Sequence, residues 1–73
     1  MVNVREREAD RFTTFVLEHY KSHVGLNGWN TLQLFLAYGV IDYLKQYYEI
    51  TSSEPLESVF ADIDEFIAAR QQQ

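Results

Sequence analysis

The sequence predicts an all-α fold, a small bundle of three to four helices. Three segments repeat apolar residues at spacings of three and four, which is the period of an amphipathic helix. Glycine, asparagine, serine and proline separate these segments. No alternation of apolar and polar residues longer than four positions indicates a strand.

The first helix is predicted over residues 5–23, with Asn3 as a plausible N-cap. Gly25, Asn27 and Gly28 favour a chain turn directly after this helix. The helix carries one continuous stripe that we expect to face the core: Ala9, Phe12, Phe15, Val16, His19, Tyr20 and His23.

The middle segment begins where Asn30 or Thr31 can cap a helix. Its apolar stripe keeps one phase as far as Tyr47, which favours a single helix. Gly39 leaves a second interpretation open, in which a left-handed residue divides the segment into two shorter helices. In that case Asp42 can cap the second of them.

The last helix is predicted to start at Pro55, with Ser53 or Glu54 as its cap. Its two faces are clearly separated, one apolar and the other rich in acids. The chain ends near residues 1–4 and 71–73 are expected to fray. Across the three segments the predicted core comprises Phe12, Val16, Leu32, Phe35, Leu36, Leu44, Val59, Phe60, Ile63 and Ile67.

A chain of 73 residues makes one domain, residues 1–73. A chain of this size buries only about 62% of its unfolded surface, so an isolated monomer is marginally stable. Disulfides are excluded because the chain has no cysteine. We therefore expect stabilisation by association, either as a homo-oligomer, most simply a homodimer, or with another protein.

The net charge of −5 argues against binding to a phosphate backbone, so we expect no direct nucleic-acid partner. No apolar run approaches 18 residues, and the first residues lack the apolar core of a signal peptide. We expect no membrane partner and a cytoplasmic location.

His19 and His23 stand four residues apart and project to one side of a helix, so the pair is a weak candidate for a metal or proton site. No acid shares their stripe to complete a metal site, and Glu18 projects about 100° away, so it cannot orient either histidine for catalysis. The acidic run 62–65 lacks the glycine turn of a calcium loop. We expect neither a metal nor another cofactor.

Catalytic chemistry has no support in the sequence. There is no Gly-x-Ser-x-Gly elbow and no glycine-rich phosphate loop. A chain of this length would also have difficulty in building an enclosed pocket without emptying its core. We expect no catalytic residues, no enzyme activity and no small-molecule substrate.

The eleven aromatic residues are more than a core of this size needs. Tyr43 and Tyr47 lie on the inward stripe, and we expect them to pack in the core. The side chains that we expect to bind a partner are the edge aromatics Trp29, Tyr38 and Tyr48, with the acids Asp62, Asp64 and Glu65 attracting a basic protein.

Several segments carry a resemblance to a known family. They are Phe-Val-Leu-Glu-His-Tyr from Phe15, residues 34–44, Tyr-Glu-Ile at 48–50 and residues 62–67. With these segments the chain resembles the short bacterial proteins of the domain of unknown function 3791 family. The resemblance implies a small helical protein of bacterial or phage origin. It also implies a gene beside larger proteins, some of which resemble ADP-ribosylating toxins, and it implies no activity.

Two functions remain as hypotheses. The first is a non-enzymatic interaction module, an antitoxin-like or accessory partner of a neighbouring protein, which binds through an apolar and aromatic face rimmed by acids. The second is a small regulator or sensor that uses the pair of histidines for a metal or a proton.

Overall fold

The computed structural model describes residues 4–72 and confirms the all-α class. Its five helices are α1 (Val4–Val24), α2 (Gly28–Tyr38), α3 (Val40–Gln46), α4 (Tyr48–Thr51) and α5 (Leu56–Gln71). The predicted cap Asn3 lies outside the described residues, as do the outermost positions of the ends that we expect to fray.

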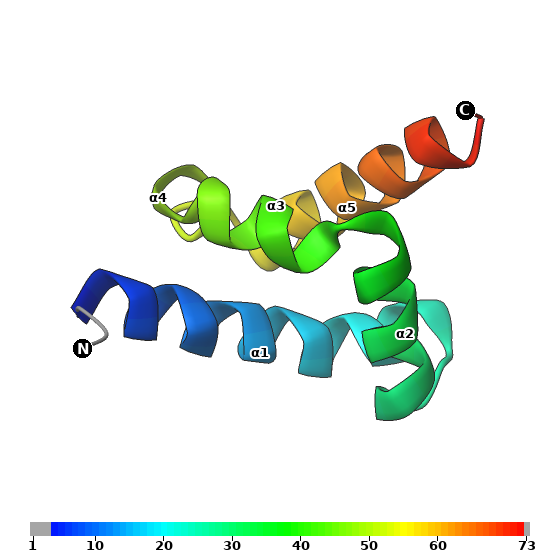
Figure 1. The fold of residues 1–73 in the computed structure, drawn as a ribbon, viewed down its shortest axis with the longest axis horizontal. Helices are drawn as coiled ribbons and strands as arrows, with labels where there is room; N and C mark the ends of the chain where they lie inside the picture. Colours follow the sequence, from blue (N-terminus) through cyan, green and yellow to red (C-terminus); the bar gives the residue numbers. More distant parts are fainter. Residues whose placement is uncertain (1–3, 73) are drawn as a thin grey trace.

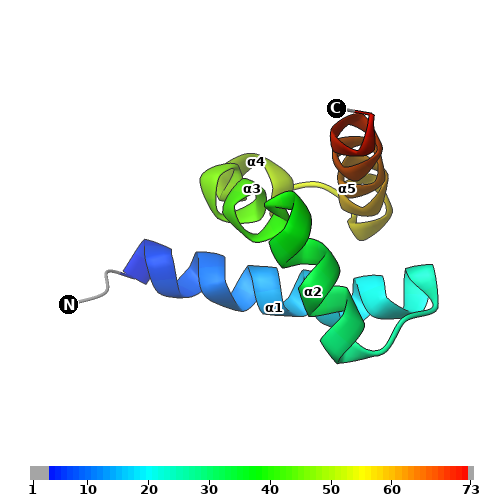
Figure 2. The ribbon, with the colours of Figure 1, turned by 45° about the vertical axis from the view of Figure 1, so that its right-hand side comes forward.

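The long helix α1 forms one side of the molecule, and α3 and α4 run above it in Figure 1. Helix α2 crosses the C-terminal end of α1, whereas α4 lies near its N-terminal end. Figure 2 shows α5 beside α3 and α4, directed away from α1. Two ion pairs join the layers, because Lys45 of α3 lies 2.9 Å from Asp10 and Arg5 lies 3.2 Å from Glu49 of α4.

The middle segment divides at Gly39, so the interpretation with two shorter helices is confirmed and the single helix is wrong. Gly39 has φ 73°, and its N–H donates to the Phe35 carbonyl. Because this left-handed conformation strains any residue with a side chain, glycine ends α2 there at low cost. Asp42 lies in the first turn of α3, which has no side-chain cap.

The caps of two helices differ from the prediction. Asn27, rather than Asn30 or Thr31, caps α2, and its side chain accepts a 2.7 Å hydrogen bond from the Asn30 N–H. Helix α5 starts at Leu56 after Pro55, without a side-chain cap. Ser53, a predicted cap of α5, instead donates its hydroxyl backward to the Ile50 carbonyl. The short polar side chains in these turns thus satisfy whichever backbone groups lie nearest.

The core is buried as predicted at Val16, Phe35, Leu44, Val59, Ile63 and Ile67. Leu36 was wrongly predicted to lie in the core, because it is 57% exposed on the outer side of α2. Phe12 and Phe60 are half-buried at the margin of the core, whereas half-buried Leu32 lines a surface groove.

The buried stripe of α1 is narrower than predicted. It follows Ala9, Thr13, Val16 and Tyr20 at spacings of four, three and four, and it leaves Phe15 exposed. Thr13 fits this apolar stripe because its hydroxyl donates to the Ala9 carbonyl of the preceding turn.

Candidate functional site

The net negative charge of the protein comes from one part of the chain, residues 46–73. Residues 1–45 contain five acidic and five basic side chains, whereas residues 46–73 contain six acidic side chains and one basic. The whole net charge of −5 therefore comes from α4, α5 and the segments around them. Any surface of this half attracts cations.

A groove opens on this acidic half, where α3, α4 and α5 meet. Its volume is ≈ 460 Å³, and it is lined by Tyr43, Tyr47, Ile50, Thr51, Glu54 and Phe66. The floor is aromatic, because the Tyr43 ring stacks on Phe66 with 4.5 Å between centroids and lies 5.3 Å from the Tyr47 ring.

The break between α3 and α4 creates this groove. At the junction Tyr47 leaves helical geometry, with φ −106° and ψ 26°. The side chains on either side of the break turn outward, so Tyr47 is 42% and Ile50 62% exposed. The prediction that Tyr43 and Tyr47 pack in the core is correct in part for half-buried Tyr43 and wrong for Tyr47.

One carboxylate, that of Glu54, lines the groove, and those of Asp62 and Glu65 act on its titratable groups. Partial burial, followed by the charges of Asp62 and Glu54 and more weakly of Glu65, raises the pKa of the Tyr43 hydroxyl. A hydrogen bond with Asp62, with a smaller contribution from desolvation, raises the pKa of the Glu54 carboxyl. Among residues 4–72, neither Glu54 nor Asp62 forms an ion pair with a basic side chain. Their mutual repulsion is therefore uncompensated within the described chain.

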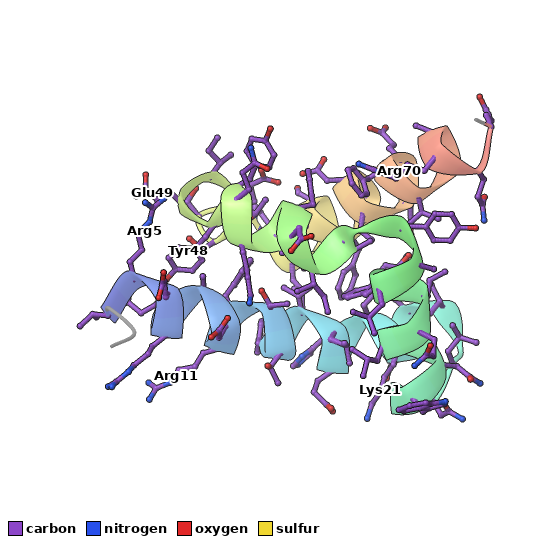
Figure 3. All side chains as sticks on the ribbon, viewed as in Figure 1. Arg5, Arg11, Lys21, Tyr48, Glu49 and Arg70 are labelled. Carbon is purple, nitrogen blue, oxygen red and sulfur yellow. The ribbon has the colours of Figure 1, made fainter. Side chains whose placement is uncertain are left out.

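A second hollow of ≈ 310 Å³ lies on the other side of the same aromatic floor and includes Asp42 and Arg70. The Arg70 guanidinium lies over the Phe66 ring, 4.3 Å from its centroid. This residue is labelled on α5 in Figure 3. The Phe66 ring thus already attracts one cation from within the chain, and an exposed aromatic floor can attract another.

The structure does not bring the three predicted aromatic anchors together. Trp29 is 68% exposed on α2, whereas Tyr48 lies on α4 at the other end of α1. Figure 3 shows Tyr48 between α4 and α1, and its ring meets the edge of Phe12 at 5.6 Å. Tyr38 is half-buried, and its hydroxyl accepts a 3.4 Å hydrogen bond from Gln71.

The predicted acids take different positions on α5. Asp62 and Glu65 lie near the Tyr43 hydroxyl, as their effect on its pKa indicates. Asp64 contacts α1 instead, where its carboxylate accepts a hydrogen bond from buried Tyr20 and lies 3.0 Å from His23 Nε2. Burial, followed by this hydrogen bond and the charge of Asp64, raises the pKa of Tyr20 far above its usual value.

The two histidines make separate contacts. The His19 ring packs 4.3 Å from that of Phe15, and its Nδ1 lies 3.0 Å from the Phe15 carbonyl. The His23 ring stacks on Phe60 at 4.9 Å. No group of three or more His, Asp or Glu side chains in residues 4–72 is placed to hold a metal ion. None of the helices in this part of the chain has the length and apolarity needed to cross a membrane.

Comparison with known proteins gives one match. A family model described as "Protein of unknown function (DUF3791)" covers residues 11–70, a range that runs from α1 through α5. No curated protein and no solved structure matches the chain.

Proposed function

The chain belongs to the DUF3791 family of proteins of unknown function, and from that premise we propose that it is a non-enzymatic protein-interaction module. Its binding site is the groove between α3, α4 and α5, defined by Tyr43, Tyr47, Ile50 and Phe66 with Glu54 and Asp62 at its rim. We call this site the acidic aromatic groove. Its ligand is a basic, amphipathic segment of another protein.

The observation that carries the proposal is the combination of an exposed aromatic floor with carboxylates that have no basic partner in the described chain. Tyrosine and other amphipathic aromatics are enriched at interface anchors. An apolar side chain placed against Tyr47 and Ile50 would bury surface that is now in water. A lysine or arginine beside it would neutralise the repulsion between Glu54 and Asp62.

The chemistry of the groove supports a non-enzymatic function. Its titratable groups are tyrosines and carboxyl groups, and the Tyr43 hydroxyl holds its proton more tightly than usual. A nucleophile needs the opposite shift or an adjacent base. Binding of a chain segment needs only the surface that is present.

The biological setting of the proposal follows from the family resemblance. We place the module in the bacterial cytoplasm, as an antitoxin-like or accessory partner of a larger protein. The groove would then hold a lysine- or arginine-bearing segment of that protein.

The proposal is tested with three synthetic helical peptides that carry a fluorescent label. The first has leucines at spacings of three and four with lysines at the positions between them, the second replaces every leucine with serine, and the third replaces every lysine with glutamate. Fluorescence anisotropy should show binding of the first peptide only, with an affinity that falls as salt is added. The serine peptide separates the groove from simple charge attraction, because it keeps every positive charge.

Matched variants locate the binding. Ile50→Ala should weaken the lysine–leucine peptide about 5- to 30-fold, the effect of losing one well-packed apolar contact. Leu36→Ala is the control, because Leu36 is about as exposed on α2 but lies outside the groove. Equal affinity of the lysine–leucine and lysine–serine peptides, or equal effects of the two variants, would refute the groove as the site.

A second candidate function rests on the contact between His23 and Asp64, which join α1 to α5. We propose as the alternative that the protein is a small regulator or sensor that uses His19 and His23 for a metal or a proton, with the proton held at this contact. A protonated histidine forms an ion pair with a neighbouring carboxylate. A melting temperature of His23→Gln that depends on pH in the same way as that of the parent would refute proton sensing. A zinc-induced rise in melting temperature that is lost in His19→Ala would support the metal.

A further inference from the structure

Helix α2 contains no charged residue. Its inner side is buried through Thr31 and Phe35. Its outer side presents Trp29 and Leu36, with exposed fractions of 68% and 57%. These two side chains are seven residues apart, so they lie on one side of the helix about 10.5 Å apart along its axis. We call this surface the α2 face.

The apolar character continues beyond α2. A groove of ≈ 320 Å³ beside the helix is lined by Leu17, Leu32 and Ile41, together with Thr13, Thr14 and the ion pair of Asp10 with Lys45. Lys21, at the C-terminal end of α1, is paired with Glu18 at 3.0 Å. Charged side chains near the α2 face are thus neutralised within the chain.

We propose that the α2 face binds a second copy of this chain and forms a two-fold symmetric dimer. This inference goes beyond the proposed function, because it concerns a different surface and a different occupant. In the dimer the two α2 helices pack antiparallel, with the symmetry axis beside the midpoint between Trp29 and Leu36. Trp29 of each copy then contacts Leu36 of the other, which is the reciprocal pairing that two-fold symmetry requires.

Charge decides between a second copy and another partner. Two identical copies repel each other wherever they present their acidic halves, residues 46–73. The α2 face belongs to residues 1–45, in which acids and bases balance. An uncharged face gives a basic or an acidic partner no electrostatic preference, whereas it removes the main barrier to self-association.

The α2 face is small for a dimer interface. A specific interface buries about 800 Å² on each partner, about a sixth of the 5022 Å² accessible surface of this chain. The outer side of an eleven-residue helix has a smaller area than this. The side chains of Leu17, Leu32 and Ile41 extend the apolar surface beside it. We therefore expect a dimer that dissociates on dilution rather than a permanent one.

Sedimentation velocity over a range from low micromolar to near millimolar concentration tests the proposal. The unmodified chain should shift from a mass of 8.6 kDa toward twice that value. Trp29 is the only tryptophan, so its fluorescence should shift to shorter wavelength over the same concentrations. Leu36→Glu should remain a monomer throughout, because the dimer would then bury two unpaired carboxylates, each against Trp29 of the other copy.

Ile50→Glu is the matched control, because Ile50 is as exposed as Leu36 but lies on the acidic half. It should still form the dimer. A chain that stays monomeric at every concentration would overturn the proposal, and so would a Leu36→Glu variant that still dimerises. Loss of the dimer in Ile50→Glu alone would assign self-association to the acidic aromatic groove and thereby overturn it too.

A second measurement applies even where Leu36→Glu does not fold. Gln33 is exposed near the midpoint of the α2 face, and the chain has no cysteine of its own. Helices packed 8–10 Å apart bring facing Cα atoms to about 4–5 Å, a distance that a disulfide can bridge. Oxidised Gln33→Cys should form a covalent dimer, whereas Glu57→Cys on α5 should not; the absence of a Gln33→Cys dimer contradicts the antiparallel pairing.

Discussion

Replacing Tyr20 by phenylalanine removes a single hydroxyl from the contact between α1 and α5. The Tyr20 side chain is 2% exposed, and its hydroxyl donates to the Asp64 carboxylate. A hydrogen bond to a charged group contributes about 1.5–3 kcal/mol. Because the Asp64 side chain is 46% exposed, water replaces part of that contribution. We expect Tyr20→Phe to lower the free energy of unfolding by about 1–2 kcal/mol, or the melting temperature by about 5–15 °C.

A double-mutant cycle isolates this bond. Tyr20→Phe, Asp64→Ala and the double variant are unfolded with urea, and the coupling energy should be about 1–2 kcal/mol. The contact of His23 with Asp64 is lost in both variants that carry Asp64→Ala, so it cancels from the coupling. Additive effects, or a Tyr20→Phe variant that melts with the parent, would refute the assignment of this bond as a link between the helices.

Four further predictions use the same unfolding and binding assays. Stability should fall as the pH rises above 10, because Tyr20 has a raised pKa and keeps its proton in the folded chain where the unfolded chain releases it; Tyr20→Phe should flatten this dependence. Gly39→Ala should lower the free energy of unfolding by about 1–2 kcal/mol, because alanine is strained at a φ of 73° even though its Cβ would meet no neighbour. Gly28→Ala, where φ is not positive, should leave the stability unchanged or raise it slightly. Ile63→Ala should cost about 2–5 kcal/mol, because Ile63 is fully buried; a variant that melts with the parent would contradict the register of α5. Affinity for the lysine–leucine peptide should fall as the pH decreases, and the fall should begin at a higher pH than for an ordinary glutamate, because the pKa of Glu54 is raised; Glu54→Gln should remove this step.

The sequence predicts the helices well where local signals agree. The stripe of α5 places Val59, Ile63 and Ile67 in the core, as the structure confirms. At Gly39 the local sequence left two interpretations open, a continuous helix or a break. The structure has the break, in which Gly39 is left-handed and the next residue, Val40, is buried. The break at Tyr47 has no glycine or proline to mark it, so only tertiary packing reveals it.

The candidate site was less predictable because its parts are distant in the sequence. An aromatic surface rimmed by acids was expected, but its expected anchors Trp29, Tyr38 and Tyr48 do not line the groove. Its residues were not foreseen, since Tyr47 leaves the inward stripe only after the chain breaks. The contact of Tyr20 with Asp64 spans 44 positions, and no periodicity on either helix indicates it.

Mapping of the lysine–leucine peptide by nuclear magnetic resonance tests the central claim most directly. Backbone amide shifts of the isotope-labelled chain are followed as the peptide is added. The account predicts the largest changes at Tyr47, Ile50 and Glu54 and around Phe66, the residues that line the acidic aromatic groove. Small, uniform changes over all the acids, or the largest changes on the α2 face, would contradict it.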